Sequence, residues 1–521
     1  MISCDVHYPY YSLDGSCNSL GSPTRGMTFM PFRRVVKPMD MNEADAVFVK
    51  QFEMDGTLCM EHRASFKKQK LKYDPIVRNF AEFVSLDMVQ TLGTVRNTGD
   101  THDWDDDLLK NGECPSHYEE ETLNRITSFI DGSQIYGTTF HVSSSLRKME
   151  NGLLHIPQEE VQSFHTQMER EQGMSVELFI TLFKLEHNRL ASQIKDAYKD
   201  YGVILGRKED ETIYQESRRI IIGVLQHIIY DKFLPVILGS DLFNRFELTT
   251  IKNTYYDRNL NPSIFNGFLT AFFDIFTEPC DNMTNSFSED DLMSDINSII
   301  NLNKYPHLIA IFKDFNDDHG TYQSYKNLCG LANQTISNIT WTELLDVFKG
   351  NKSSIDLFSG GFVEEPVQDG LIGPTFACII AYQFHLAKAG DRHFYSNVRH
   401  GYPSHHNPHT DQTLIQSLQK PKPKKLKKSF IRQIEAKFYK DDPNFNYIRD
   451  SYRFNYDEVN EIRHRSLGGL FCDNGRISHT SQFSFYKKEG KWNHIIPCDS
   501  ILPFNTRIFI DSSNANLIKK K

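Results

Sequence analysis

The residues best suited to recognition chemistry form a basic segment between positions 403 and 452. Nine lysine and arginine side chains fall within residues 420–440, beside Pro421 and Pro423. They are Lys420, Lys422, Lys424, Lys425, Lys427, Lys428, Arg432, Lys437 and Lys440. Such a density of positive charge attracts polyanions such as acidic glycans, acidic lipid or nucleic acid, or an acidic protein partner. A solvated surface insertion is the simpler interpretation, and the sequence leaves both open.

The histidines give weaker indications of metal binding or catalysis. His405, His406 and His409 precede the basic segment and could bind a metal ion, although a polar loop is the simpler interpretation. His187 lies in the helical stretch Glu186–Arg189, where we expect a hydrogen-bonded structural residue rather than a catalyst. The sequence contains no P-loop, dinucleotide fingerprint, nucleophile elbow or HExxH zinc motif.

Cysteines and glycosylation motifs indicate the compartment. The nine cysteines include no CxxC pair, which argues against zinc ribbons and thioredoxin-like redox centres. Four N-x-[ST] motifs, at Asn282, Asn333, Asn338 and Asn351, cluster in one third of the chain. Together these features predict a secreted, disulfide-bonded glycoprotein, with at least one free or intermolecular thiol because the cysteine number is odd. Residues 1–11 have neither the basic start nor the apolar stretch of a signal peptide.

Composition narrows the fold class. The 521 residues carry a formal net charge of -9, with 39% hydrophobic and 24% charged residues, and the mean hydropathy is -0.47. These values exclude collagen, coiled-coil and disordered chains. The longest apolar candidate for a membrane span, Ile220–Leu238, is interrupted by Gln226, His227, Asp231 and Lys232, so we expect no span.

The periodicity of apolar residues predicts a mainly α chain with little β structure. Residues 1–40 are rich in Tyr, Pro, Gly and Ser and predict an irregular arm. Helices are expected at 41–65, 175–194, 211–238 and 375–388, the last ending near Gly390. Pro235 should end or kink the third of these helices.

Nine short segments, in order along the chain, resemble the animal haem peroxidase family, which includes myeloperoxidase, lactoperoxidase, peroxidasin and the chorion peroxidases. They are residues 14–18, 127–137, 186–191, 226–239, 318–320, 328–331, 370–380, 390–392 and 471–474. The resemblance implies one large, mostly helical domain over residues 1–521, with the basic segment at about 403–452 as an insertion. It also implies the disulfides Cys4–Cys17, Cys329–Cys378 and Cys472–Cys498. Cys59, Cys114 and Cys280 then have no family partner and could link the chain into an oligomer.

A haem peroxidase needs a proximal histidine on the iron, and a distal histidine and arginine to cleave bound peroxide. The family's distal helix reads Gly-Gln-Phe-x-Asp-His-Asp, and matching it to residues 50–56 places Asp55 at the distal histidine. On the proximal side, Phe276 falls on the position of the iron ligand, and a phenyl ring has no lone pair for iron. Arg170 is the candidate for a surviving distal arginine.

Two further phenylalanines reinforce this pattern. Phe312 and Phe315 fall on the family positions of an asparagine that orients the proximal histidine and an arginine near the haem propionates. An empty pocket of roughly 300 Å³ or more would cost on the order of 7 kcal/mol, so a chain without haem must fill it. We therefore predict a secreted pseudoenzyme that has lost haem and acts as a binding or scaffold protein. The alternative is an active peroxidase of halide or phenolic donors with displaced ligands such as Cys59 or His62.

The resemblance also implies a calcium site. In the family a Thr-x-Phe-x-Asp-x-Ser loop wraps Ca²⁺, and Thr127, Phe129 (through its carbonyl), Asp131 and Ser133 match it. These oxygen donors suit a hard cation. The remaining family ligand, an aspartate after the distal histidine, falls on Gly56 in the match to residues 50–56. The sequence leaves open whether the loop binds calcium or keeps its conformation without metal.

Overall fold

The computed structural model describes residues 8–36, 73–90, 123–170, 173–251, 256–273, 320–332, 350–397, 453–487 and 493–510, with a few single positions between them. The helix expected at 41–65 and the basic segment at 403–452 lie outside these residues, so both stay predictions. Within the described ranges the chain is mainly helical, as predicted, and its strands form two short antiparallel pairs.

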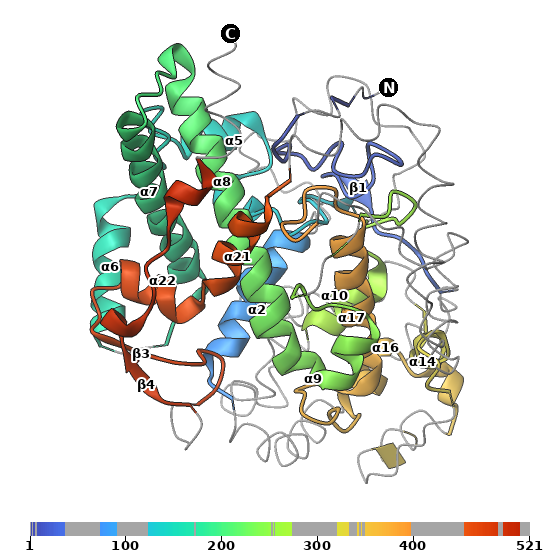
Figure 1. The fold of residues 1–521 in the computed structure, drawn as a ribbon. Coiled ribbons are helices and arrows are strands. Elements are labelled where there is room, and N and C mark those ends of the chain that lie inside the picture. The colour runs from blue at the N-terminus through green and yellow to red at the C-terminus, as the bar shows by residue number, and fades with distance from the viewer. Residues whose placement is uncertain are drawn as a thin grey trace, which may run out of the picture.

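Long helices build the centre of the fold. Figure 1 shows α2, α8, α9, α10 and α17 in the middle of the molecule, with α6, α7 and α22 on one side and α14 and α16 on the other. The five central helices and α7 span Ile76–Met88 (α2), Val176–Asp200 (α7), Glu209–His227 (α8), Leu234–Arg245 (α9), Asn266–Phe273 (α10) and Pro374–Ala389 (α17). The predicted helices at 175–194 and 375–388 are confirmed.

Shorter elements surround this centre. The other α-helices are α4 (Ser133–Tyr136), α5 (Phe140–Ser145), α6 (Gln158–Glu169), α14 (Tyr322–Leu328), α16 (Leu357–Phe362), α21 (Tyr456–His464) and α22 (Leu467–Asn474). Strand β1 (Met30–Pro31) pairs with β2 (Leu123–Asn124), and β3 (His479–Ser481) pairs with β4 (Ile495–Pro497). Single 3₁₀ turns occupy Gly206–Lys208, Lys352–Ser354, Cys498–Ser500 and Thr506–Phe509.

The helix predicted at 211–238 differs from expectation at Pro235. The chain passes from α8 through a π-helical segment, Ile228–Phe233, directly into α9, where Pro235 lies in the first turn. Proline is tolerated there because the preceding turn is of the wider π type, in which the Leu234 N–H donates to the Ile229 carbonyl, five residues back. The helical geometry breaks instead at Gly239, whose φ of 67° favours glycine and where a Cβ would lie 2.4 Å from the Gln368 carbonyl oxygen.

The core explains why these helices pack together. Phe80 of α2 contacts Phe179, Phe233 and Phe485 with ring centroids 5.0–5.2 Å apart. Aromatic pairs of this geometry contribute about 0.5–1.5 kcal/mol beyond their buried area. Of the described residues, only Gly206–Arg245 is long and apolar enough to be a candidate membrane span, and 83% of its apolar window is buried within the protein, as in a core helix.

The three disulfides implied by the family resemblance are present. Cys4 pairs with Cys17, Cys329 with Cys378, and Cys472 with Cys498. Each closes a loop of the unfolded chain and typically stabilises the fold by about 2–4 kcal/mol. The second joins α14 to α17, and the third joins α22 to the strand pair β3–β4. Cys59, Cys114 and Cys280 lie outside the described residues.

Candidate functional site

The four residues predicted to bind calcium lie together in the loop that leads into α4. Asp131 is at the centre: its Oδ2 accepts a hydrogen bond from Thr127 Oγ1 at 2.9 Å, and its Oδ1 accepts one from Ser133 Oγ at 2.5 Å. All four side chains are buried, with Phe129 fully enclosed. The loop therefore gathers two hydroxyls and a carboxylate in a small volume that solvent does not reach.

A fifth residue, Asp87, completes this cluster and was missed by sequence reasoning. It lies near the C-terminal end of α2, is fully buried, and accepts hydrogen bonds from the backbone N–H groups of Ser133 (2.6 Å) and Gly132 (3.2 Å). Those bonds tie the end of α2 to the loop at residues 127–133. The family pattern could have revealed it, since residues 81–87 match that pattern at Phe83 and Asp87.

The electrostatics of the two carboxylates suit a bound cation. Burial raises the pKa of Asp87 well above its usual range, and the neighbouring Asp131 raises it further. Burial likewise raises the pKa of Asp131 to about 6, against the opposing hydrogen bonds from Ser133 and Thr127. Two buried carboxylates this close resist simultaneous ionisation, although the positive charge of Arg218 lowers the pKa of both. Hard oxygen donors of this kind are the ligands that calcium prefers, so the residues present fit that ion.

The described ranges hold no group of three or more His, Cys, Asp and Glu side chains placed to bind a metal. The cluster has only two such side chains, Asp131 of the loop and Asp87 of α2, and its other donors are hydroxyls and the carbonyl of Phe129. A calcium ion would therefore depend on Asp87, Asp131, Thr127, Ser133 and that carbonyl together. Calcium commonly binds such mixtures of carboxylate, carbonyl and hydroxyl oxygens.

Helix α2 also carries the residues beside Asp87 that bear on haem. With Asp87 aligned to the last aspartate of the family pattern, Leu86 falls on the distal histidine and Ser85 on the ester-forming carboxylate. Ser85 donates its hydroxyl to the Glu82 carbonyl at 2.8 Å, within its own helix. Neither an aliphatic side chain nor this hydroxyl offers the nitrogen or the carboxylate that haem peroxidase chemistry needs.

The other predicted haem-side positions are only partly described. Asp55, Gly56, Phe276, Phe312 and Phe315 lie outside the described residues, and their assignments stay predictions. The alignment of Leu86 with the distal histidine is an alternative to the alignment of Asp55 with it. Arg170 follows the last residue of α6 and is exposed to solvent.

His187 is a buried structural residue, as the sequence suggested. Its Nδ1 accepts a hydrogen bond from the Tyr136 hydroxyl at 3.0 Å, and its Nε2 donates to the Gly152 carbonyl at 2.9 Å. Burial lowers the pKa of His187 to about 4. The imidazole therefore stays neutral near neutral pH and joins α4, α7 and the loop at Gly152.

This histidine predicts an acid-sensitive fold. Because its pKa is about 4 in the folded chain and about 6.5 when unfolded, the unfolded state binds more protons between these values. Stability should therefore fall as pH drops from about 6.5 towards 4, by up to about 3 kcal/mol from this residue. Urea unfolding at pH 7 and pH 4.5 measures the effect. His187→Gln should show a smaller loss between the two pH values, and an unchanged loss would contradict the assignment.

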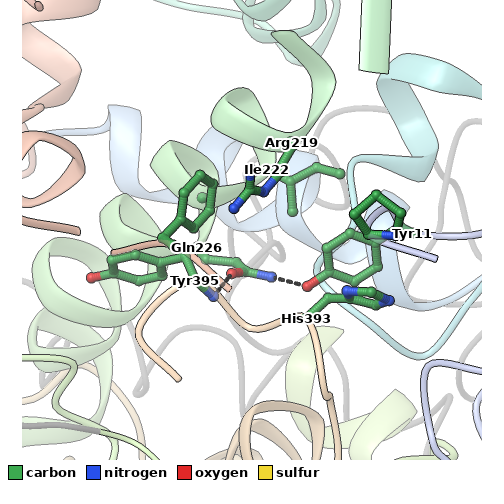
Figure 2. A pocket seen from close by; sticks show the side chains of 9 residues that line it. Tyr11, Arg219, Ile222, Gln226, His393 and Tyr395 are labelled. Atoms are coloured by element: carbon green, nitrogen blue, oxygen red, sulfur yellow. Dashed lines mark hydrogen bonds between the residues drawn. The ribbon is translucent and has the colours of Figure 1, made fainter. Parts of the chain in front are cut away.

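A small cavity lies between the N-terminal arm, α8 and the segment after α17 (Figure 2). Its volume is about 10 Å³, enough for about one water molecule. Gln226 lines the cavity and connects two other lining residues. Its Nε2 donates to the Tyr11 hydroxyl at 2.8 Å and its Oε1 accepts from the Tyr395 N–H at 2.9 Å (Figure 2). Tyr11 in turn donates to Asp391 at 2.6 Å. The hydrogen bonds around this cavity connect parts of the fold, and the cavity itself is too small for a cofactor.

Of the four predicted glycosylation sites, only Asn351 is described. It is exposed at the start of a 3₁₀ turn, where its side chain accepts a hydrogen bond from the Ser353 N–H at 3.1 Å. Asn282, Asn333 and Asn338 lie outside the described residues, as do the basic side chains at 420–440.

Comparison with known proteins shows what this architecture is similar to. Chorion peroxidase of Drosophila melanogaster is 28% identical over 362 residues, which cover 55% of this chain and 44% of that protein. Peroxidasin homolog pxn-1 of Caenorhabditis elegans is 23% identical over 536 residues, covering 75% of this chain and 40% of that protein. The chain therefore spans less than half the length of these two relatives.

Solved structures give the same fold. A fatty acid alpha-dioxygenase from Oryza sativa aligns over 87% of this chain and 89% of its own, with a TM-score of 0.51 and 13% identity. That likeness concerns the fold alone. The sequence model of the animal haem peroxidase family matches residues 10–306 and 309–413, well over half of the chain. The chain belongs to the animal haem peroxidase family.

Proposed function

We propose that this chain is a secreted pseudoenzyme of the peroxidase family, which keeps the scaffold but has lost haem and peroxide chemistry. The observation that carries the proposal is the position of Asp87. Its hydrogen bonds to Gly132 and Ser133 match the role expected of the family aspartate that follows the distal histidine. With α2 in that register, Leu86 takes the place of the histidine.

A leucine at this position removes the group that moves a proton in the family reaction. A general base must present a titratable nitrogen or oxygen within hydrogen-bond reach of the peroxide, and a hydrocarbon side chain has none. The predicted Phe276 removes the nitrogen donor on the opposite side of the iron. The residues present therefore do not fit haem, and we derive no catalytic step through it.

Peroxidase turnover tests this function. The purified chain, supplied with haem, H₂O₂ and a phenolic donor, should oxidise the donor no faster than the same amount of free haem. Turnover well above free haem would favour the alternative of an active enzyme with displaced ligands. The double variant Leu86→His with Phe276→His is assayed beside it, because it restores an imidazole at both the distal and the proximal position.

Calcium binding is the part of the family chemistry that we propose the chain retains. Asp87, Asp131, Thr127 and Ser133 are buried and joined by hydrogen bonds, and Phe129 lies in the same loop. The ion would join α2 to the loop before α4 and so stabilise the scaffold rather than take part in a reaction.

Without peroxidase activity, the function that we propose for the chain is binding to a partner outside the cell. Three disulfides support an oxidising compartment, where such bonds form and persist. The basic segment at 420–440 is the proposed contact for a polyanion or an acidic partner, on the strength of its charge. Deleting residues 420–440 should lower the salt concentration at which the chain leaves a heparin column, and unchanged retention would remove this segment from the account.

A further inference from the structure

A second candidate site lies at the start of α2, at the opposite end of this helix from Asp87 and the calcium loop. It is an open groove of about 410 Å³, bounded by the start of α2, the end of α6 and strand β3. The volume falls within the range of roughly 300–1,000 Å³ that is usual for small-molecule sites. The position of α6, α22 and β3 along one side of the molecule can be followed in Figure 1.

Two opposite charges line this groove without a partner in the described residues. Glu169, the last residue of α6, and Arg476, two residues after α22, are both exposed and make no side-chain hydrogen bond or ion pair there, with each other or with any described residue. Their segments are nevertheless in contact, because a Cβ on Gly475 would lie 3.2 Å from Met168 Cε. The groove thus holds an anion and a cation on packed elements, and Asp74 adds a second carboxylate.

The backbone at Arg476 is unusual for its residue type. Its φ of 53° lies in the left-handed region, where glycine or asparagine normally ends a helix. A bulky side chain there is uncommon, and such positions concentrate at ligand sites. The arginine lines the groove from this conformation, and the adjacent hairpin is held to α22 by the Cys472–Cys498 disulfide.

Apolar side chains complete the lining. Met168, Met174 and Phe471 are 9%, 4% and 7% exposed and contribute to the groove surface. Methionine adapts to ligands of different shape because its side chain is unbranched and polarizable. The hydroxyls of Ser478 and Ser481 lie on the β3 side and can hydrogen-bond polar groups beside Arg476.

We propose that this groove binds a zwitterionic ligand with an apolar side chain, that is, a free apolar α-amino acid or a short apolar peptide. Arg476 would hold the carboxylate by a charge-assisted, bidentate pair. Glu169, with Asp74 nearby, would hold the ammonium group, and the methionine and phenylalanine side chains would cover the apolar part. The proposal goes beyond the pseudoenzyme function and does not depend on the absence of haem.

Isothermal titration calorimetry with L-leucine and with L-leucyl-L-leucine tests the site in the intact chain. Saturable binding of either probe is expected, and the better of the two identifies an amino acid or a peptide as the natural class. N-acetyl-leucinamide, which lacks both charges, should not bind. Arg476→Gln and Glu169→Gln should each weaken binding at least tenfold.

Arg507→Gln is the matched control, because Arg507 is also an exposed arginine but pairs with Asp200 rather than lining the groove. It should bind like the unmodified chain. The proposal is overturned if neither probe gives saturable binding, if the capped compound binds as tightly as leucine, or if the Arg476 and Glu169 variants keep the original affinity. A thermal unfolding curve for each variant shows that the exposed substitutions leave the fold intact.

Discussion

Replacing Glu186 with alanine is expected to lower the free energy of unfolding by about 3–5 kcal/mol, because it removes the buried anion between Arg465 and Arg189 and leaves them only Asp473, which is 32% exposed. Glu186 is 1% exposed. Its carboxylate accepts hydrogen bonds from Arg465 Nη2 at 2.6 Å and from Arg189 Nε at 2.7 Å, and a third from Asn474 Nδ2 at 2.9 Å. Despite burial, these partners lower the pKa of Glu186 to about 2, so it is ionised at neutral pH.

Urea unfolding of the two proteins measures the change. Asp200→Ala is the matched control, because Asp200 also pairs with an arginine, Arg507, but both side chains are more than half exposed. An exposed pair contributes about 0–1 kcal/mol, so this control should unfold almost like the unmodified chain. Glu186 lies in α7 and Asn474 in α22, so the network joins these two helices. Equal losses for Glu186→Ala and Asp200→Ala would contradict a stabilising role for it.

Calcium is expected to raise the midpoint of thermal unfolding, and removing it with a chelator should lower that midpoint. At a calcium concentration 100 times the Kd, binding to the folded chain alone stabilises it by about 2.7 kcal/mol. Asp131→Asn should abolish the shift because Asp131 holds the hydroxyls of Thr127 and Ser133 in place. Asp87→Asn should do the same, which would identify Asp87 as the ligand that the match to Gly56 had left missing.

Asp241→Asn controls for the general loss of a carboxylate. Asp241 is 82% exposed, and among the residues that the structure describes it forms an ion pair only with Arg245 in the next turn of α9. Its replacement should leave the calcium-dependent shift unchanged. A chain whose unfolding midpoint does not respond to calcium or to the chelator would show that the loop keeps its conformation without metal.

Several parts of the fold could be predicted because their signals are local. The helix at 375–388 is apolar at nearly every position and is followed by Gly390, and the structure places it in the core as α17. Three disulfide pairs were also correct, although they depended on the family resemblance rather than on cysteine spacing. The chemistry of Pro235 alone predicts a break, whereas the preceding π-helical segment and the first-turn position make it compatible with α9.

The site was harder to predict because its residues meet only in three dimensions. The family pattern for the distal helix is short and matches both residues 50–56 and residues 81–87 in part. The hydrogen bonds of Asp87 to Gly132 and Ser133, 45 and 46 residues away in the chain, favour the second match. The groove at Arg476 gave no signal in the sequence, since its charges and apolar residues come from separate segments.

The haem content of the purified protein tests the central claim most directly. The chain would be purified from cells supplied with a haem precursor, and an active family member would be produced in the same way as a control. The absorbance spectrum and the amount of haem per chain would be measured for both. We predict no Soret band and far less than one haem per chain, while the active relative carries its full complement. A Soret band with one haem per chain would contradict the account, because an iron ligand would then exist that Leu86 and Phe276 cannot supply.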